Sequence, residues 1–130
     1  GDLRHYNSCN VLSLHALLGA YSDEGAKWLD ELRPVLADNI RYACDFIAAH
    51  FPGVQVMQPQ GTYMLFLDCA AWLQEHHMTL RELEERGARA GVIWQDGAAF
   101  AWPDSIRMNL ALPHSRLVEA MERLRVHAFC

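Results

Sequence analysis

Apolar side chains alternate with polar or small ones along residues 105–113, and this period of two is typical of a β-strand. The apolar positions would face a core and the others would face away from it: Ile106, Met108, Leu110 and Leu112 against Ser105, Arg107, Asn109 and Ala111. Pro113 would end the strand, because proline has no N–H group to donate to a neighbouring strand. An arginine in mid-strand stands on rigid backbone, which suits a planar group that binds a carboxylate with two hydrogen bonds. From the pattern alone, a solvent-exposed Arg107 is the simpler interpretation.

A short helix is predicted over residues 11–21, with Asn10 as its N-terminal cap. Apolar residues lie almost all around this segment, and a helix without a polar face should be buried on several sides. A chain of 130 residues would struggle to surround it. The pattern therefore predicts that residues 11–21 contact a partner surface outside this domain.

A long helix follows the acidic turn 22–25. Its apolar positions recur at spacings of three and four from Leu29 to Phe51, which predicts one apolar stripe. Pro34 interrupts the pattern and should kink or break the helix near Arg33 without abolishing it. Pro52 and the glycine after it should end the helix.

The second half of the chain alternates short strands with helices. Strands are predicted over 54–57, 62–67 and 92–94, with a helical turn over 70–74 and a turn over 95–97. Segment 62–67 is apolar on both faces, which is typical of a central strand.

Two helices complete the predicted order, and the first has clear end signals. Thr79 and Glu82 fit a capping box, Met78 and Leu83 fit a hydrophobic staple around it, and Gly91 would end that helix. A closing amphipathic helix is predicted from the spacing of apolar residues over 117–128, with Ser115 as its cap.

Paired strands separated by a helix favour an α+β fold: a small antiparallel or mixed sheet with helices packed on one face. In that arrangement the sheet face that carries Arg107 would be left uncovered. The length of 130 residues suits a single domain.

Composition narrows the classes of function. Apolar residues make up 52% of the chain and charged residues 21%, with a net charge of −5, which is typical of a soluble globular protein. No Lys/Arg cluster, membrane-length apolar run or signal-peptide pattern is present, so nucleic acid and membrane partners are not expected. Cys9, Cys44, Cys69 and Cys130 are scattered, which favours free thiols in a reducing, cytoplasmic compartment.

No complete catalytic or metal-binding set is visible. His76 and His77 are adjacent, so they could not comfortably ligate one metal, and no other ligand repeats at a suitable spacing near them. The remaining histidines are dispersed, and no glycine-rich phosphate motif follows a strand. The residues alone therefore assign neither a metal nor a catalytic group to this chain.

Several motifs in order resemble the C-terminal small domain of fold-type I pyridoxal-phosphate enzymes, the class I and II aminotransferases, and their cystathionine β-lyase-like branch most closely. The matching segments are Trp28-Leu29-Asp30-Glu31-Leu32 with Asn39, Pro59-Gln60-Gly61-Thr62-Tyr63-Met64 with Asp68, Gly91-Val92 with Gly97-Ala98-Ala99-Phe100, and Arg107-Met108-Asn109-Leu110-Ala111-Leu112-Pro113. The resemblance covers the chain from about Asn7 to its end.

The resemblance implies roles for three residues. Arg107 would bind the α-carboxylate of the substrate, and Tyr63 and Phe100 would lie near the substrate pocket, although packing explains both equally well. Asn109 is interpreted as a structural hydrogen-bonding residue. The sequence departs from the family at Asp96, where a proline usually precedes the glycine, and in the short segment 100–107, which lacks the usual glycines.

The resemblance also implies what this chain does not supply. Pyridoxal 5'-phosphate would be held by a preceding large domain that contributes the lysine, since Lys27, the single lysine here, is interpreted as a surface residue of the long helix. Residues 1–21 would link to that missing domain. The parent would be a homodimer that binds an amino acid, and this fragment alone is expected to be inactive.

Four functions stay open at this point. Transamination of an amino acid by the parent enzyme comes first, and cleavage of carbon–sulfur bonds by a β-lyase comes second, favoured by the Asn-x-Ala-x-Pro ending. A stand-alone module that binds carboxylates and a purely structural dimerisation domain are the alternatives from other classes.

Overall fold

The computed structural model describes residues 10–130, which fall into two compact units with their boundary between Pro34 and Val35. In the first unit, helix α1 (Val11–Ala20) is capped as predicted by Asn10, whose side-chain oxygen accepts a hydrogen bond of 2.8 Å from the backbone N–H of Ser13. In the described part of the chain, no α1 side chain is buried. The predicted burial of this helix is therefore not provided by residues 10–130.

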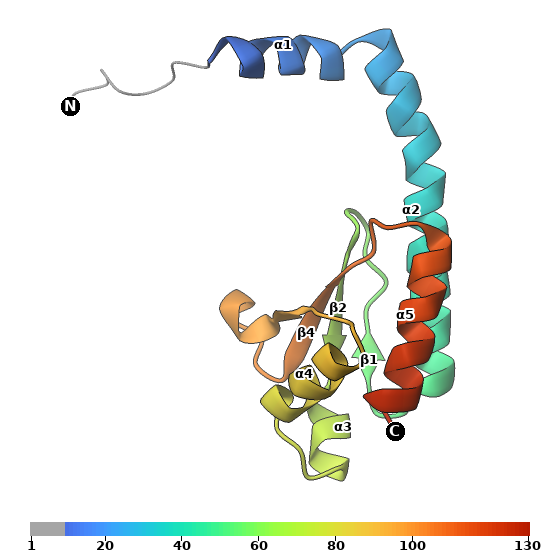
Figure 1. Cartoon of the computed structure of the whole chain (residues 1–130), viewed down its shortest axis with the longest axis vertical. Helices are drawn as coiled ribbons and strands as arrows, with labels where there is room; N and C mark the ends of the chain where they lie inside the picture. The colour runs from blue at the N-terminus through green and yellow to red at the C-terminus, as the bar shows by residue number, and fades with distance from the viewer. Residues whose placement is uncertain (1–9) are drawn as a thin grey trace, which may run out of the picture. The chain divides into compact units, whose positions relative to one another are not determined.

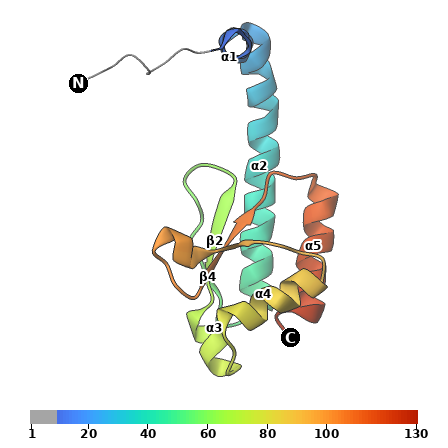
Figure 2. The same ribbon diagram turned by 60° about the vertical axis from the view of Figure 1, so that its left-hand side comes forward.

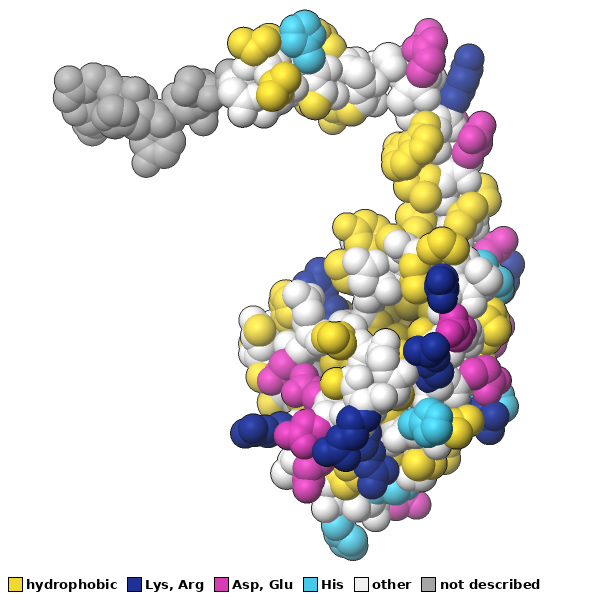
Figure 3. Space-filling view, viewed as in Figure 1, with side chains coloured by type: hydrophobic (Ala, Val, Ile, Leu, Met, Phe, Trp, Pro, Cys, Tyr) yellow, Lys and Arg dark blue, Asp and Glu magenta, His cyan; other side chains and the backbone are white. Residues whose placement is uncertain are grey.

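The exposed apolar surface of α1 carries a testable consequence. Figure 3 shows apolar side chains along α1, and Leu12 and Leu18 are 81% and 64% exposed. Because exposed apolar area drives association, we expect the isolated chain to self-associate as its concentration rises, and the double variant Leu12→Lys/Leu18→Lys to do so less. Light scattering over a concentration series measures this. A monomer at high concentration that also binds little hydrophobic dye would contradict the expectation.

Helix α2 (Asp23–His50) persists through Pro34 as predicted, and of the two distortions expected near Arg33, a kink or a break, the break does not occur. Its start is capped by Ser22, whose hydroxyl accepts a 3.1 Å hydrogen bond from the N–H of Gly25. A proline removes one hydrogen bond of a helix, and the helical turns on both sides of Pro34 persist despite it. The buried side chains of α2 all lie after Pro34 and include Ile40, Ala43 and Ile47.

The second unit contains a four-stranded antiparallel sheet, which confirms the predicted α+β fold. The strands are β1 (Gln55–Val56), β2 (Met64–Asp68), β3 (Gln95–Asp96) and β4 (Ser105–Asn109), in the spatial order β1-β2-β4-β3. β2 is central, as its apolar composition predicted. All three strand pairs are antiparallel, and the longest joins β2 to β4.

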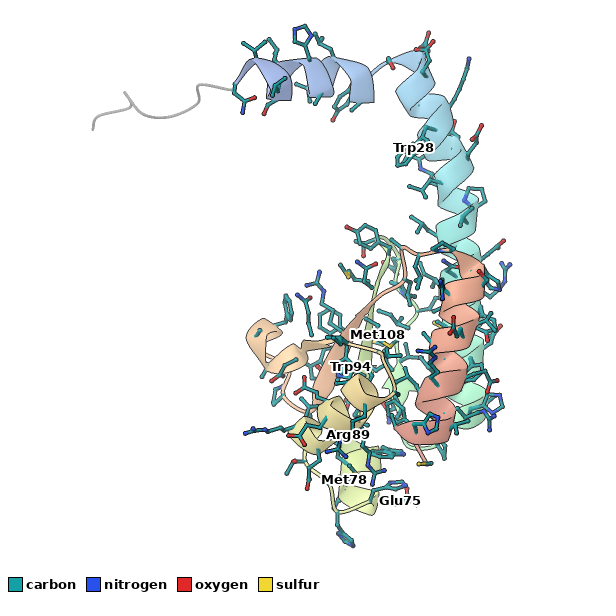
Figure 4. The ribbon with its side chains drawn as sticks, viewed as in Figure 1. Trp28, Glu75, Met78, Arg89, Trp94 and Met108 are labelled. Carbon is teal, nitrogen blue, oxygen red and sulfur yellow. The ribbon has the colours of Figure 1, made fainter. Side chains whose placement is uncertain are left out.

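The helices α3 (Ala70–Glu75), α4 (Leu80–Arg89) and α5 (His114–His127) complete this unit. Figures 1 and 2 show α5 and the part of α2 after Pro34 side by side against the same face of the sheet. Figure 4 shows Met108 on the side of β4 that faces α5. Its partner Leu65 and the pair Leu67 and Ile106 are fully buried. Among the described residues, none of the helices combines the length and apolar character that a membrane crossing requires.

The capping box predicted for α4 is confirmed. The Thr79 hydroxyl accepts from the N–H of Glu82, and the Glu82 carboxylate accepts from the N–H of Thr79, which completes the capping box. Gly91 follows the helix with φ of +80°, a left-handed conformation that favours glycine.

The structure corrects three predicted boundaries. β4 ends at Asn109 rather than at Pro113, because the Asn109 side chain accepts a 2.8 Å hydrogen bond from the N–H of Ala111 and diverts the chain. This bond also confirms the structural role predicted for Asn109. Pro113, and not Ser115, is the residue before α5, which starts at His114.

The third correction concerns residues 92–97, where the predicted strand and turn are displaced. Val92 donates its N–H to Gly87 at the end of α4, and the Trp94 ring packs over Gly87, so 92–94 forms no strand. Pairing with β4 begins at Gln95, where a turn was predicted.

Cys69 has a pH-dependent effect on stability that can be measured. Its side chain is fully buried, and burial, with a smaller contribution from Asp68 and Asp104, raises the pKa of the thiol from 9.0 to about 12. The unfolded thiol ionises near pH 9 while the folded thiol stays neutral, so stability is complete below pH 9. It should then fall as the pH rises toward 12, by up to about 1.4 kcal/mol per pH unit.

Urea denaturation between pH 8 and pH 11 tests this prediction by comparing the wild type with Cys69→Ala. We expect the free energy of unfolding of the wild type to fall more steeply over that range. Parallel profiles for the two proteins would show that Cys69 does not carry the alkaline dependence.

Candidate functional site: an arginine in an aromatic concavity

Three residues form one row across the sheet on the face opposite the buried core. The antiparallel register pairs Phe66 on β2 with Arg107 on β4, and Arg107 with Gln95 on β3. Directly paired residues point to the same side of a sheet, so the arginine lies between an aromatic ring and an amide. The alternation seen in the sequence therefore correctly separated Arg107 from the core-facing Ile106 and Met108.

A concavity of about 600 Å³ lies at this row. Its lining consists of Thr62, Tyr63, Met64, Phe66, Phe100 and Arg107. The three residues predicted from the sequence, Arg107, Tyr63 and Phe100, are thus brought together, although they lie on three different segments. Their roles toward a substrate remain predictions.

The Arg107 side chain has a defined orientation. One terminal nitrogen donates a 2.8 Å hydrogen bond to Oε1 of Gln95, and the guanidinium carbon lies 4.6 Å from the centre of the Phe100 ring. A cation over an aromatic face is attracted by the ring's negative electrostatic potential. Arg107 is partly buried and held from two directions, unlike the freely solvated side chain that the simpler interpretation described.

The short 3₁₀ helix η1 (Gly97–Phe100) carries Phe100 over the sheet. Asp96 caps it, since its carboxylate accepts a 2.7 Å hydrogen bond from the N–H of Ala98. A Cβ atom at Gly97 would collide with the Ser105 side chain, so glycine allows η1 to pack closely against β4. Asp96 thus provides a start for η1 although the proline usual in the family is missing.

Aromatic side chains cover part of the face that was expected to be free. The Phe66 ring meets Phe100 edge to face at 5.6 Å and stacks on Trp102 at 6.0 Å. Trp102 was not recognised from the sequence. The prediction of a fully uncovered face is therefore corrected: η1 and Trp102 cover part of it, and the concavity is what remains open.

The loop between Phe100 and β4 turns without glycine. Ala101 and Asp104 take φ angles of +59° and +60°, the left-handed region that L-residues rarely adopt. The loop is held by Ser105, whose buried hydroxyl donates a 2.7 Å hydrogen bond to the carbonyl of Trp102. Thr62, at the rim of the concavity, is also left-handed at +66°, which places backbone strain next to the site.

Asn39, which the sequence analysis named only as part of a matching motif, is a positioning residue whose contacts the sequence did not predict. It is fully buried on α2, and its amide nitrogen donates to the carbonyls of Leu110 and Leu112, both at 2.9 Å. Its side-chain oxygen therefore acts as the acceptor for Nδ1 of His114 at 3.0 Å. Asn39 fixes the chain as it leaves β4, and the signals available in the sequence were its place in the matching motif and its polar side chain among the apolar positions of α2.

The lining of the concavity defines its chemistry. Arg107 is the one charged residue among the lining residues, and the other walls are aromatic or apolar apart from Thr62 and the Tyr63 hydroxyl. Within residues 10–130, no group of His, Cys, Asp or Glu is arranged to hold a metal ion. The lining contains no lysine, and Lys27 is exposed on α2. The charged group in the lining is thus a planar guanidinium, whose shape matches a pair of carboxylate oxygens, and the lining contains no amine for covalent attachment of a cofactor.

Comparison with known proteins gives consistent matches. Residues 2–124 match the sequence profile of the family described as aminotransferase class I and II. Protein MalY of Escherichia coli is 33% identical over 122 residues, and cystathionine β-lyase PatB of Bacillus subtilis is 28% identical over 119 residues. These alignments cover 91% and 89% of this chain. The structure of a pyridoxal-phosphate-bound C–S lyase from Staphylococcus hominis matches 94% of the chain with a TM-score of 0.82 at 25% identity.

The chain spans 30% of the length of each of these two relatives and 32% of the solved lyase chain. Its fold is the α+β unit that is also present in the pyridoxal-phosphate-bound C–S lyase of S. hominis. More narrowly, the chain belongs to the aminotransferase class I and II family.

Proposed function

We propose that this chain is the C-terminal small domain of a pyridoxal-phosphate-dependent enzyme and that Arg107 binds the α-carboxylate of its amino-acid substrate. The observation that carries the proposal is the held orientation of the Arg107 guanidinium on one wall of an otherwise aromatic and apolar concavity. A carboxylate accepts two parallel hydrogen bonds from a guanidinium, and the pair gains strength where surrounding walls reduce contact with water. Phe66 and Phe100 supply such walls.

The cofactor belongs to the proposed parent enzyme. Pyridoxal phosphate acts as an electron sink that stabilises negative charge at the α-carbon of an amino acid. The concavity of this chain supplies no amine to attach it, so the lysine that holds the cofactor would belong to the large domain. Their task is to bind and orient the substrate by its carboxylate and to limit the access of water to that end.

Carbon–sulfur bond cleavage is the reaction that we put first. PatB is named a cystathionine β-lyase, a Corynebacterium glutamicum relative of the same name is 35% identical over 118 residues, and the S. hominis structure is titled a C–S lyase. Transamination, which the sequence alone put first, is the second candidate, because the family is described by that activity.

The proposed partners are a large cofactor-binding domain, an amino-acid substrate and a second copy of the full-length protein. Residues 1–21 are proposed to link to the large domain; residues 1–9 of this segment lie outside the described residues. The exposed apolar side chains of α1 support a contact with such a domain, because burying them removes apolar area from water.

The test begins with the genomic sequence upstream of Gly1, where we expect an in-frame region that contains the cofactor lysine. The full-length protein is then supplied with pyridoxal phosphate and assayed with cystathionine. A β-lyase should release pyruvate, ammonia and a thiol in equal amounts. An aminotransferase should instead require a 2-oxo acid and form a second amino acid without releasing a thiol.

Experiments on the same protein also distinguish the two alternatives from other classes, a carboxylate-binding module and a dimerisation domain. A stand-alone carboxylate-binding module predicts no upstream domain and measurable binding of carboxylates by residues 1–130. A purely structural dimerisation domain predicts neither binding nor activity. Either result would contradict the proposal if the protein encoded by the longest open reading frame also shows no cofactor absorbance.

A further inference from the structure

We infer that Gln95 is a positioning residue for Arg107: a neutral acceptor that fixes the guanidinium toward the concavity without cancelling its charge. The inference rests on the proposed function, since it concerns how the arginine is presented to a substrate carboxylate. Gln95 lies on the short edge strand β3, outside the residues that line the concavity, and would act through Arg107 rather than on the substrate.

The geometry of this contact is set by the backbone. Gln95 and Arg107 are direct partners in the β3–β4 register, so their side chains leave the sheet side by side. Oε1 of Gln95 accepts one hydrogen bond at 2.8 Å from a terminal nitrogen of Arg107. Among residues 10–130 it is the one side-chain oxygen that accepts from this guanidinium, which leaves other N–H groups of the fork available for a ligand.

The same short segment holds the arginine from both directions. Gln95 contacts the edge of the guanidinium, and Phe100, five residues later, places its ring against the guanidinium carbon. Asp96 and Gly97 lie between them and fix the path of the chain through the cap of η1 and its close packing on Ser105. Segment 95–100 therefore determines where the guanidinium points.

The chemical identity of residue 95 matters because of charge. An amide oxygen accepts a hydrogen bond but leaves the full positive charge on the arginine. A carboxylate at the same position would form a charge-assisted pair, which is roughly twice as strong as a neutral hydrogen bond, and would compete directly with the substrate carboxylate. Asp96, the nearest acidic residue in the chain, accepts from the N–H of Ala98 instead.

Two nearly isosteric variants of the full-length enzyme test this inference. Gln95→Glu should raise KM for the amino-acid substrate by about tenfold or more, because the new carboxylate occupies the fork. Gln95→Leu removes the acceptor without adding charge, and it should raise KM by a smaller factor with kcat nearly unchanged. Gln74→Glu is the matched control, since it makes the same change of charge at an exposed position of α3.

The deciding measurement uses a ligand without the carboxylate. The ligand is the α-carboxamide of the substrate, tested as a substrate or as a competitive inhibitor. It is measured with Arg107→Ala and with the three variants Gln95→Glu, Gln95→Leu and Gln74→Glu. If Gln95 positions the guanidinium, the losses in Gln95→Glu and Gln95→Leu appear with the acid and are much smaller with the amide. A structural role would weaken both ligands equally, and thermal melting identifies any variant that does not fold.

Arg107→Ala separates the two proposals. If Arg107→Ala loses selectivity for the acid while both Gln95 variants behave like Gln74→Glu, the positioning role of Gln95 is wrong and the proposed function stands. If Arg107→Ala treats acid and amide alike, the proposed function itself fails, and the inference fails with it.

Discussion

Replacing Arg107 by alanine in the full-length enzyme should lower kcat/KM for amino-acid substrates by an amount equivalent to about 2–5 kcal/mol of transition-state binding. The guanidinium is the one charged group in the lining of the concavity, so its removal would leave a substrate carboxylate without a counter-ion among these residues. Cofactor binding should change little, because no lining residue offers an amine to the cofactor. Steady-state kinetics and the cofactor absorbance measure the two effects separately.

Arg107→Lys distinguishes geometry from charge. Lysine keeps the positive charge but offers one compact donor group instead of a planar fork, so the variant should fold normally and show a raised KM. The guanidinium of Arg107 reaches Gln95 with one nitrogen while its carbon lies 4.6 Å from the centre of the Phe100 ring, and one compact ammonium group could not reproduce both contacts and a two-point grip on a carboxylate.

Met108→Ala is the matched control on the other face of the same strand. Met108 is 5% exposed in the core, and its truncation should lower the melting temperature and leave substrate specificity unchanged. The expected loss is about 2–5 kcal/mol of folding free energy. If Arg107→Ala unfolds the protein while the folded remainder keeps its kinetics, the arginine is structural and its proposed role is wrong.

Local patterns predicted the features whose causes lie within a few residues. The capping box of α4 is one example, because Thr79 and Glu82 satisfy each other's hydrogen bonds three residues apart. The direction of Arg107 is another, since alternation along β4 decides which side chains face the core. Alternation could not decide where pairing stops, because the end of β4 depends on Asn109 bonding to Ala111.

The contacts that shape the site depend on residues far apart in the chain or on pairing that the pattern did not reveal. The sequence pattern placed a strand at 92–94, whereas β3 begins at Gln95. The pattern could not reveal this shift, because it results from the packing of the Trp94 ring over Gly87 of α4. With β3 misplaced, Gln95 could not be recognised as the partner of Arg107. Asn39 shares this difficulty, because its carbonyl acceptors lie 71 and 73 residues away.

Replacing Asn39 by alanine should markedly lower the stability of the protein. Asn39→Ala would remove the donors to the carbonyls of Leu110 and Leu112 and the acceptor for His114. The Leu110 carbonyl keeps the N–H of Leu112 at 3.0 Å, Leu112 is partly buried and His114 is exposed, so the cost comes mainly from three lost hydrogen bonds at a buried amide. At about 0.5–1.5 kcal/mol each, we expect a total loss of about 2–4 kcal/mol in the free energy of unfolding. Asn109→Ala is the control: it is exposed, makes one hydrogen bond to Ala111, and should cost about 0.5–1.5 kcal/mol.

Asn39→Asp gives the prediction a pH signature, measured by urea denaturation at pH 5 and pH 8. The new carboxylate would be buried against two carbonyl oxygens, and both burial and these dipoles favour its neutral form, so its folded pKa is raised above the unfolded value of about 3.9. Above about pH 3.9 the unfolded carboxyl ionises while the folded one stays neutral, so stability falls as the pH rises from that value to the raised folded pKa and changes no further above it. The destabilisation relative to wild type should therefore be larger at pH 8 than at pH 5, whereas the loss in Asn39→Ala should change little between them. Equal losses for Asn39→Ala and Asn109→Ala, with no pH dependence in Asn39→Asp, would show that the buried amide does not fix the chain beyond β4.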